Sequence, residues 1–208
     1  MRQLVITRSL TDRSSATVNR YFSELNHMKM VSADEEIELA RRIRKGDKVA
    51  LHKLVNANLR FVVSVAKQYQ NFGIPLEDLI EEGNIGLIRA AERFDETKGF
   101  KFISYAVWWI RQALVRAIQN HSRTIRLPSH VHDRLQRSQR IKAELTGKLG
   151  REPTPAELAP ALGTDTDSLE ALDRLSREAI SLESNVAGTA KRLEDFVPDA
   201  AADRPDGA

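Results

Sequence analysis

The sequence predicts an all-α protein with two small helical domains joined by short linkers and an extended or disordered C-terminal tail. Three observations support this prediction. Apolar residues recur at spacings of three and four, helix caps and helix-ending glycines separate these stretches, and strand-like alternation bounded by hairpin turns is missing. The 208 residues, 41% hydrophobic and 29% charged, suffice for one large or two small packed domains.

The first predicted helices have strong start and stop signals. Ser32 and Glu35 form a capping box, and Gly46 ends the helix that follows. Asp47 is placed to cap a second, longer helix. The apolar positions of this second helix recur at three and four: Leu51, Leu54, Val55, Leu59, Val62, Val63 and Ala66.

The next two predicted helices are separated by a short turn. A break at Gly73 precedes a helix over roughly residues 75–93. Residues 95–99 form the turn, and a further helix covers about residues 102–120. The first of these two helices carries its apolar residues at helical spacing.

The last predicted helices are shorter and more polar. One spans roughly residues 130–149, after a proline interrupts the pattern. A second capping box at residues 154–157, with proline at the first helical position, starts a helix that stops at Gly163. A final helix covers residues 166–177, with a threonine as the expected cap. After Ile180 the helical pattern fades, which predicts the tail.

Charge is unevenly distributed, although the formal net charge is only +3. Residues 101–151 contain eleven Lys or Arg and two acidic residues, whereas residues 152–208 contain five basic and thirteen acidic residues. This asymmetry favours a polyanion at one surface and a different partner at another. An ordinary solvated helix surface explains either patch equally well when it is taken alone.

Several protein classes find no support in the sequence. Cysteine is absent, which excludes disulfides and thiolate metal sites and favours a reducing cytoplasm. No apolar run is long enough for a membrane helix or a signal peptide. Motifs of phosphate-binding loops, zinc proteases and nucleophilic enzymes are missing, so we expect no enzyme, cofactor or small-molecule substrate. A metal site at His130, His132 and Asp133 is a weak alternative, because no further ligand lies at suitable spacing.

The most informative segment is residues 98–116, KGFKFISYAVWWIRQALVR. Five of the twelve aromatic residues of the chain lie within ten positions here, interleaved with lysines and arginines. Aromatic rings stack on unpaired bases and cations follow phosphates, so this pattern favours single-stranded nucleic acid. The alternative is a helix that simply buries its aromatic residues. Neighbours on a helix lie about 100° apart, however, so at least one of Trp108 and Trp109 should point outward or lean into a second surface.

A resemblance to housekeeping bacterial sigma factors rests on three segments in the correct order: ANLRFVVSVAKQYQNFG, DLIEEGNIGLIRAAERFDETKGFKFISYAVWWIRQAL and RTIRLPSHV. The resemblance is nearly continuous over residues 21–130 and weaker to about Pro198. It implies a flexible arm, sigma domain two, sigma domain three and an acidic linker-like tail at residues 1–16, 17–127, 128–178 and 179–208. Family members continue into a fourth domain for the −35 element, which the resemblance does not reach.

The resemblance also implies that the aromatic helix opens the promoter −10 element and holds its non-template strand. Phe102, Tyr105 and Trp108 match a pocket for a flipped adenine, and Trp109 matches a partner that stacks at the fork. Stacking is on the right scale to offset the cost of base flipping. The implied DNA-binding residues are Asn58, Phe100, Lys101, Phe102, Ser104, Tyr105, Trp108, Trp109, Arg111, Gln112, Arg116, Arg123, Arg126, His130 and Asp133.

Some matched positions carry more specific expectations. Gln112 matches a residue that reads the upstream edge of the −10 element in duplex form. Its usual companion, a threonine in many members, is Val115 here, which cannot hydrogen-bond. Asn58 matches a contact to a flipped downstream thymine. His130 and Asp133 match a pair that contacts DNA just upstream, for which plain surface residues are the alternative.

A second implied site is acidic and matches the surface that docks on the coiled coil of the polymerase β′ subunit. Asp78, Glu82, Asn84 and Ile88 fall on matching positions, and Glu81 replaces a glutamine common in the family. An ordinary amphipathic surface helix is the simpler explanation from composition alone. An acidic face that meets basic helices contributes orientation and association rate more than affinity.

These features predict a cytoplasmic sigma factor and not an enzyme. It is expected to bind core RNA polymerase through β′ and β, to direct it to promoters and to melt the −10 element. The tail after Ile180 resembles a linker that threads into the polymerase cleft, although a plain disordered tail fits its composition equally. Two alternative functions remain: a stand-alone helix-turn-helix repressor on duplex DNA, and a fragment that occupies polymerase without initiating transcription.

Overall fold

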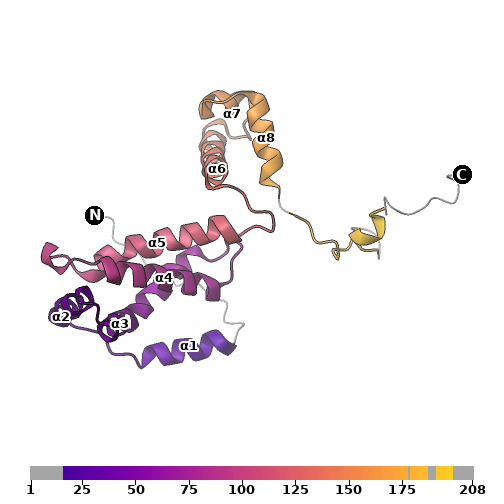
Figure 1. Cartoon of the computed structure of the whole chain (residues 1–208). Coiled ribbons are helices and arrows are strands. Elements are labelled where there is room, and N and C mark those ends of the chain that lie inside the picture. Colours follow the sequence, from indigo (N-terminus) through magenta and orange to yellow (C-terminus); the bar gives the residue numbers. More distant parts are fainter. Residues whose placement is uncertain (1–15, 178, 187–190, 199–208) are drawn as a thin grey trace, which may run out of the picture. The chain divides into compact units, whose positions relative to one another are not determined.

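The structure is a computed structural model that describes residues 16–177, 179–186 and 191–198. Over these residues the chain forms eight α-helices, three short 3-10 helices and no strand, which confirms the all-α prediction (Figure 1). The chain divides into two units, Met1–His132 and Asp133–Ala208, and each is described by itself. None of the helices in the described parts is long and apolar enough to cross a membrane.

The first helix, α1 (Ala16–Asn26), is one that the sequence analysis did not predict. The flexible arm predicted for residues 1–16 otherwise lies outside the described residues. The helix contributes to the main core through residues spaced three or four apart, which is the spacing of one helix face. These residues are Tyr21, Phe22 and Leu25, and Val18 on the same helix is also buried.

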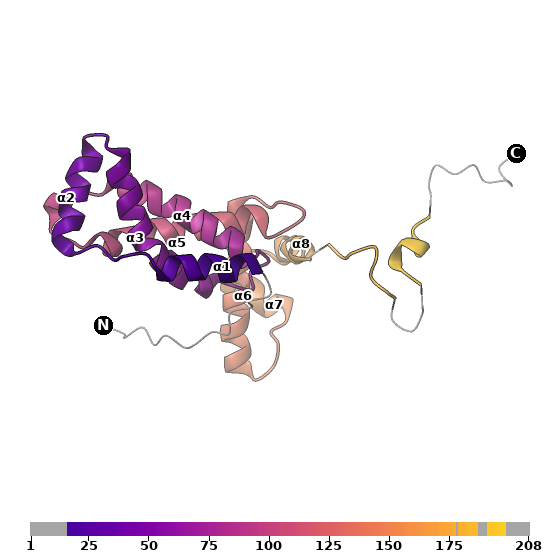
Figure 2. The ribbon, with the colours of Figure 1, turned by 90° about the horizontal axis from the view of Figure 1, so that it is seen from below.

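Helices α2 (Ala33–Arg44) and α3 (Lys48–Ala66) begin at the predicted caps, and Figure 2 shows them side by side. Ser32 Oγ accepts a hydrogen bond from the Glu35 backbone N–H at 3.3 Å, and the Ser32 backbone N–H donates to Glu35 Oε2 at 3.1 Å. Asp47 Oδ1 accepts two backbone N–H bonds from the first turn of α3, at 2.9 and 3.2 Å. These bonds satisfy donors that a helix start otherwise leaves unpaired.

Helices α4 (Leu76–Arg93) and α5 (Phe102–His121) form the centre of the first unit, and α3 packs against both. Two glycines allow this close approach. A Cβ atom at Gly86 would lie 2.8 Å from the carbonyl oxygen of Trp109, and one at Gly83 would overlap a methyl group on α3. The largest side chains with almost no exposed surface belong to the main core of this unit: Leu54, Val62, Leu79, Leu87, Phe102, Ile110 and Leu114.

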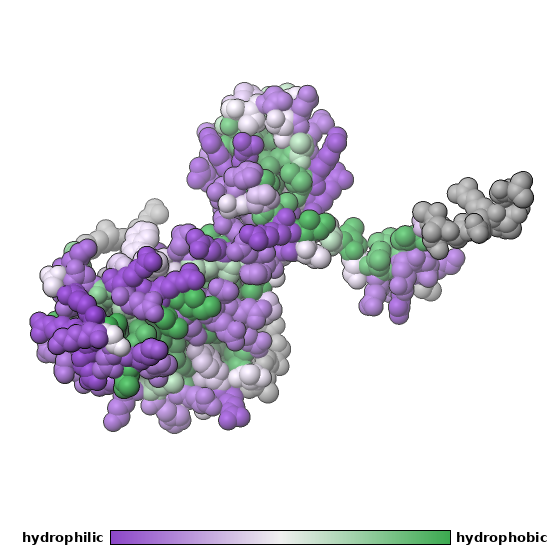
Figure 3. All heavy atoms as spheres, viewed as in Figure 1, coloured by the Kyte–Doolittle hydropathy of each residue, from purple (hydrophilic) through white to green (hydrophobic). Residues whose placement is uncertain are grey.

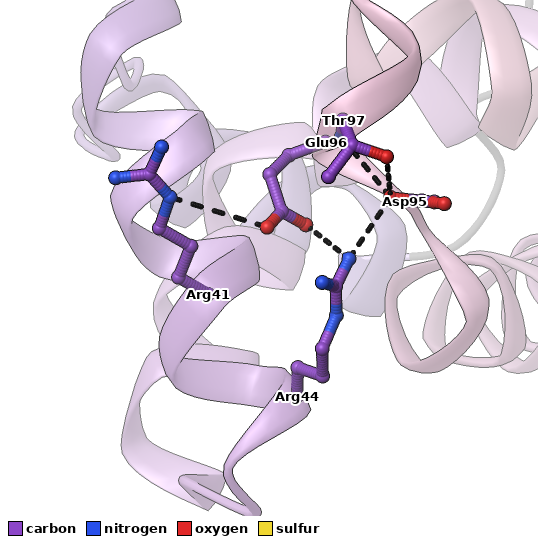
Figure 4. Close-up of polar contacts among 5 residues, drawn as sticks. All are labelled: Arg41, Arg44, Asp95, Glu96 and Thr97. Atoms are coloured by element: carbon purple, nitrogen blue, oxygen red, sulfur yellow. Dashed lines mark hydrogen bonds and ion pairs between the residues drawn. The ribbon is translucent and has the colours of Figure 1, made fainter.

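A polar network connects α2 to the 3-10 turn η2 (Glu96–Lys98), which precedes α5 (Figure 4). Arg44 Nη2 lies 2.9 Å from Asp95 Oδ1 and 2.7 Å from Glu96 Oε2, and Arg41 Nε lies 4.0 Å from Glu96 Oε1. The Glu96 side chain is only 5% exposed, whereas Arg44 is 53% exposed. The arginine therefore compensates a carboxylate that is largely removed from water.

The N-terminus of α5 has a cap from another helix. Lys101, its N-cap residue, forms no side-chain cap bond. Glu36 on α2 supplies the acceptor instead, because its Oε2 receives the Phe102 backbone N–H at 3.4 Å. A carboxylate at a helix N-terminus also interacts favourably with the helix dipole. The network and this cap together fix where the aromatic helix begins.

The second unit contains most of α6 (Ser129–Leu149), with α7 (Pro155–Leu162) and α8 (Thr166–Ser176). The capping box predicted at residues 154–157 is present. The start of α8 differs from the prediction in one detail, because Asp165 and not a threonine is its N-cap. The unit buries a small apolar cluster of Leu158, Ala159 and Leu169, against which Ile141, Leu145 and Leu162 pack.

An ion pair stabilises the turn before α7. Arg151 donates to both carboxylate oxygens of Glu157 at 2.7 and 2.9 Å, and the Thr154 backbone N–H donates to the same carboxylate at 2.9 Å. The arginine and this N–H lower the pKa of Glu157 to about 2. A hollow of about 650 Å³ lies between α6 and α8, and Figure 3 shows apolar residues open to solvent on this unit.

The described part of the predicted tail contains some local structure. Asn185 and Arg192 form an isolated antiparallel bridge, and the 3-10 helix η3 (Leu193–Phe196) follows. Backbone N–H groups of η3 donate back to carbonyl oxygens of Leu182 and Ser184 at 3.0 Å. The final residues of the predicted tail, 199–208, lie outside the described part of the chain.

Candidate functional site

The aromatic segment forms α5 and the loop before it. One face of α5 is buried in the core through Phe102, Ala106, Ile110, Ala113, Leu114 and Ala117. The opposite face centres on Trp108, whose side chain is 70% exposed. Ser104 and Gln112, one helical turn to either side, are also exposed. The expectation that at least one tryptophan points outward is therefore confirmed.

The second tryptophan differs from the first, because Trp109 is partly buried and held by neighbours. Its ring lies 6.2 Å from the Tyr105 ring at an interplanar angle of 60°. The Arg93 guanidinium lies 4.9 Å from the centre of the Trp109 ring, and the Phe94 ring lies 6.0 Å from Tyr105. Tyr105 therefore pairs with Trp109 at the side of α4, although spacing alone places it on one face with Trp108.

Two predicted DNA contacts lie in the core. Phe102 has no exposed surface and packs edge-on against Phe94, with ring centres 5.2 Å apart. A base could touch Phe102 only after its neighbours moved, and its place in a pocket for a flipped adenine stays a prediction. Asn58 is 6% exposed, and its Nδ2 donates to the Leu54 carbonyl oxygen at 2.8 Å. Phe100, in contrast, is 71% exposed.

The predicted phosphate-binding residues differ in their exposure. Lys101, Arg116 and Arg126 are exposed, whereas Arg111 and Arg123 are half-buried. Exposed cations beside an exposed ring can contact the phosphates of the same strand that the ring stacks on. The contacts themselves stay a prediction.

The predicted upstream pair lies in the first turn of α6. His130 and Asp133 are both exposed, and the division between the two units falls between them. His132 lies beside them and buries its Nε2 atom without a hydrogen-bond partner in the described structure. Among the residues that the structure describes, no group of three His, Asp or Glu could hold a metal ion.

The acidic residues of α4 gather around a hollow of about 240 Å³ at the surface of the first unit. Asp78 and Glu81 are exposed and Glu82 is half-buried. Ile85, which the sequence analysis did not select, is 42% exposed beside them. The remaining lining comes from Ile74 before α4 and from Ala117 and His121 on α5. This hollow combines carboxylates with aliphatic walls.

The other two predicted docking residues, Ile88 and Asn84, do not line this hollow, and they differ in exposure. Ile88 is 38% exposed, and it follows Ile85 by three positions along α4. Asn84 is half-buried, and its Oδ1 atom is buried without a hydrogen-bond partner in the described structure. Asn84 therefore offers a partner less of its side chain than the carboxylates do. Ile85 follows Asp78 by a step of four residues and then a step of three. Helical spacing in the sequence would therefore have identified it as a neighbour of the acidic residues.

Models of three consecutive parts of one family match this chain. The sigma-70 factor region 1.2 model matches residues 17–48, the sigma-70 region 2 model residues 54–124, and the sigma-70 region 3 model residues 133–208. The chain belongs to the sigma-70 family. Helices α4 and α5, with the acidic hollow and the exposed tryptophan, lie in region 2 of this family. Helix α2 lies wholly in region 1.2.

Curated relatives agree with this membership. RNA polymerase sigma factor SigA of Clostridium acetobutylicum is 44% identical over 189 residues, which cover 90% of this chain and 50% of that protein. The protein of the same name from a Bacillus species is 44% identical over 183 residues, which cover 88% and 48%. The chain thus spans about half the length of these relatives. The resemblance to sigma factors is confirmed.

Proposed function

We propose that this chain binds core RNA polymerase, directs it to promoters and captures unpaired bases of the −10 element during initiation. The observation that carries the proposal is the 70% exposure of Trp108 on a helix whose opposite face is fully buried. Tryptophan is usually well buried in folded proteins, so an indole presented to solvent favours a binding role. Membership of the sigma-70 family supports DNA as the partner.

The outer face of α5 fits a single strand better than a duplex. This face carries side chains at four-residue steps, about 6 Å apart along the helix axis: Trp108, Gln112 and Arg116. An indole can stack on a base that has left the helix, an amide can pair with a base edge, and a guanidinium can bind a phosphate. Tyr105 and Trp109 form the wall beside this row on the side of α4.

The acidic hollow on α4 is the proposed contact with polymerase. Its carboxylates suit lysine or arginine heads, and the isoleucines at its edge suit the aliphatic stems of those side chains. A basic helical surface, such as the coiled coil of β′ implied by the resemblance, has this chemistry. The hollow and the aromatic face use different surfaces of one unit, so both partners can bind together.

The remaining roles follow the resemblance. We propose sigma domain two at residues 17–127, sigma domain three at 128–178 and a polymerase-inserted linker at 179–208. In this assignment the chain contributes binding surfaces, with no catalytic step of its own, and acts in the cytoplasm. Cations on α6 would then follow phosphates upstream of the −10 element.

Strand opening tests the DNA part of the proposal. Trp108→Ala should leave polymerase binding intact and lower open-complex formation roughly 5- to 150-fold, the factor that corresponds to the stacking of one base. Permanganate reactivity of promoter thymines, with the chain bound to core polymerase, measures this. Val49→Ala, at a 73% exposed site on α3, is the control. DNA mispaired across the −10 element should recover part of the loss. Normal opening with Trp108→Ala would refute the proposal.

Charge reversal tests the polymerase part. Glu82→Arg should weaken binding to core polymerase without changing helicity, because it places a cation in the hollow that we assign to basic side chains. Glu92→Arg makes the same change at an exposed position on α4 outside the hollow and serves as the matched control. Equal affinity of both variants would exclude this interface. Tight binding of duplex DNA without polymerase would favour a stand-alone repressor. Polymerase binding without transcription initiation would favour an inhibitory fragment.

A further inference from the structure

The end of α4 holds two rings of the aromatic helix through consecutive residues. Arg93 is the last residue of α4, and its guanidinium lies 4.9 Å from the centre of the Trp109 ring. Phe94 is the C-cap of α4, and its ring lies 6.0 Å from the ring of Tyr105. Trp108 has no ring or cation partner of this kind among the described residues, in keeping with its exposure.

The contact between Arg93 and Trp109 is a cation–π interaction of favourable type. A guanidinium within about 6 Å of an indole centre is attracted by the ring, and tryptophan is the best acceptor for it. Its distance is the shortest of the three cation–π contacts in the described structure, since the others measure 5.4 and 5.9 Å and involve lysine with phenylalanine. No carboxylate of the described residues forms an ion pair with Arg93. The Trp109 ring is therefore the group that interacts with its charge.

The backbone of Trp109 is fixed by the same helix. The carbonyl oxygen of Trp109 lies so near Gly86 that a Cβ atom there would approach it to 2.8 Å. The Trp109 ring also contacts both the Arg93 guanidinium and the Tyr105 ring. A side-chain rotation of Trp109 would lose both ring contacts, while the close backbone packing prevents the helix from following.

We infer that Arg93 is a positioning residue, which acts on promoter DNA through the Trp109 ring. The inference rests on the proposed function, because it concerns how the single-strand surface is prepared. A ring that is ordered before the base arrives loses less conformational entropy when the base stacks beside it. The role needs a cation with a flat or compact head at the end of α4, and it does not need Arg93 to touch DNA.

Tryptophan fluorescence reports on this contact directly, because the chain has only two tryptophans and both lie on α5. In the full chain carrying Trp108→Phe, the remaining emission comes from Trp109. Arg93→Met should shift that emission to longer wavelength and raise quenching by neutral acrylamide, whereas Arg93→Lys should preserve most of the wild-type signal. Arg89→Met removes the same charge one turn earlier on α4 and should change neither quantity.

A second measurement links the contact to DNA. With Trp108 restored and core polymerase bound, Arg93→Met should weaken binding of a −10 non-template oligonucleotide about two- to fivefold more than Arg89→Met does. Arg93→Lys should bind nearly as wild type. Unchanged quenching of Trp109 in Arg93→Met, or oligonucleotide binding equal to that of Arg89→Met, would overturn the inference. The proposed function fails by a different result, namely unchanged oligonucleotide binding in Trp108→Ala.

Discussion

Replacing Gly86 by alanine tests how closely α4 and α5 must pack to hold the aromatic face. The added Cβ would lie 2.8 Å from the Trp109 carbonyl oxygen, 2.9 Å from Ala113 Cβ and 3.1 Å from Ile110 Cα. Backbone atoms of α5 cannot rotate away, so the two helices would have to separate. Forcing extra volume into a packed core costs about 1–3 kcal/mol, and contact with backbone places this site near the upper end.

The opposing effect is helix propensity. Alanine is about 1 kcal/mol more favourable than glycine inside a helix, so the expected net loss for Gly86→Ala is about 2 kcal/mol. Gly83→Ala is the matched control, because it has the same propensity gain on the same helix. Its Cβ would lie 2.6 Å from the Val62 Cγ1 atom, while the next nearest atoms are 3.7 Å away. A single methyl group can shift more easily than a backbone, so we expect a smaller loss there.

Urea unfolding followed by tryptophan fluorescence measures this difference in the first unit, where both tryptophans lie. The midpoint for Gly86→Ala should fall clearly below that of Gly83→Ala, with an unchanged slope. Acrylamide quenching of the folded variant should also rise, because separation of the helices releases Trp109. A Gly86→Ala chain as stable as the wild type would refute the close-packing argument.

Three further changes test other parts of the structure. Arg44→Ala should destabilise the first unit by about 2 kcal/mol and Glu96→Gln by less, because only the former leaves a nearly buried carboxylate with no more than the distant Arg41 as its partner; thermal melts compare them, and equal losses would contradict this. The pKa of Glu157 is lowered to about 2, mainly by Arg151, so its contribution to stability should persist above pH about 4.5 and disappear as pH falls toward 2. Acid titration followed by circular dichroism should show that stability depends less on pH in Glu157→Gln than in the wild type. Val115→Thr should sharpen discrimination at the upstream base pair of the −10 element about tenfold at most in transcription assays, and unchanged preference would exclude Val115 from base selection.

Local signals in the sequence were sufficient to predict most of the helices. The capping residues Ser32 and Asp47 accept the backbone bonds that their positions predicted. Such bonds form within three residues, so they need no knowledge of the rest of the fold. The helix α1 was missed although Val18 and Leu25 have the right spacing, because no glycine or proline follows to mark its end.

Which aromatic residues of this segment are buried depends on tertiary packing, and the spacing of residues in the sequence does not reveal that packing. Phe100 and Phe102 are two residues apart, yet one is 71% exposed and the other fully buried. The helix starts at Phe102, and the Glu36 carboxylate that receives its N–H comes from a helix 66 residues earlier. Asn58 is likewise buried by packing of the core, although its amide bonds its own helix. Contacts of this range are set by tertiary structure and leave no periodic signal in the sequence.

Helix α4 links the two proposed interfaces mechanically. Its 18 residues span about 27 Å, with the acidic hollow on its N-terminal half and Arg93 at its other end. Gly86 allows the middle of α4 to pack directly against the backbone of α5. A partner that orients the acidic end therefore also orients the residues that hold Tyr105 and Trp109. On this argument polymerase binding and presentation of the aromatic face depend on the same rigid helix, and variants that loosen its attachment to α5 should impair DNA capture more than docking.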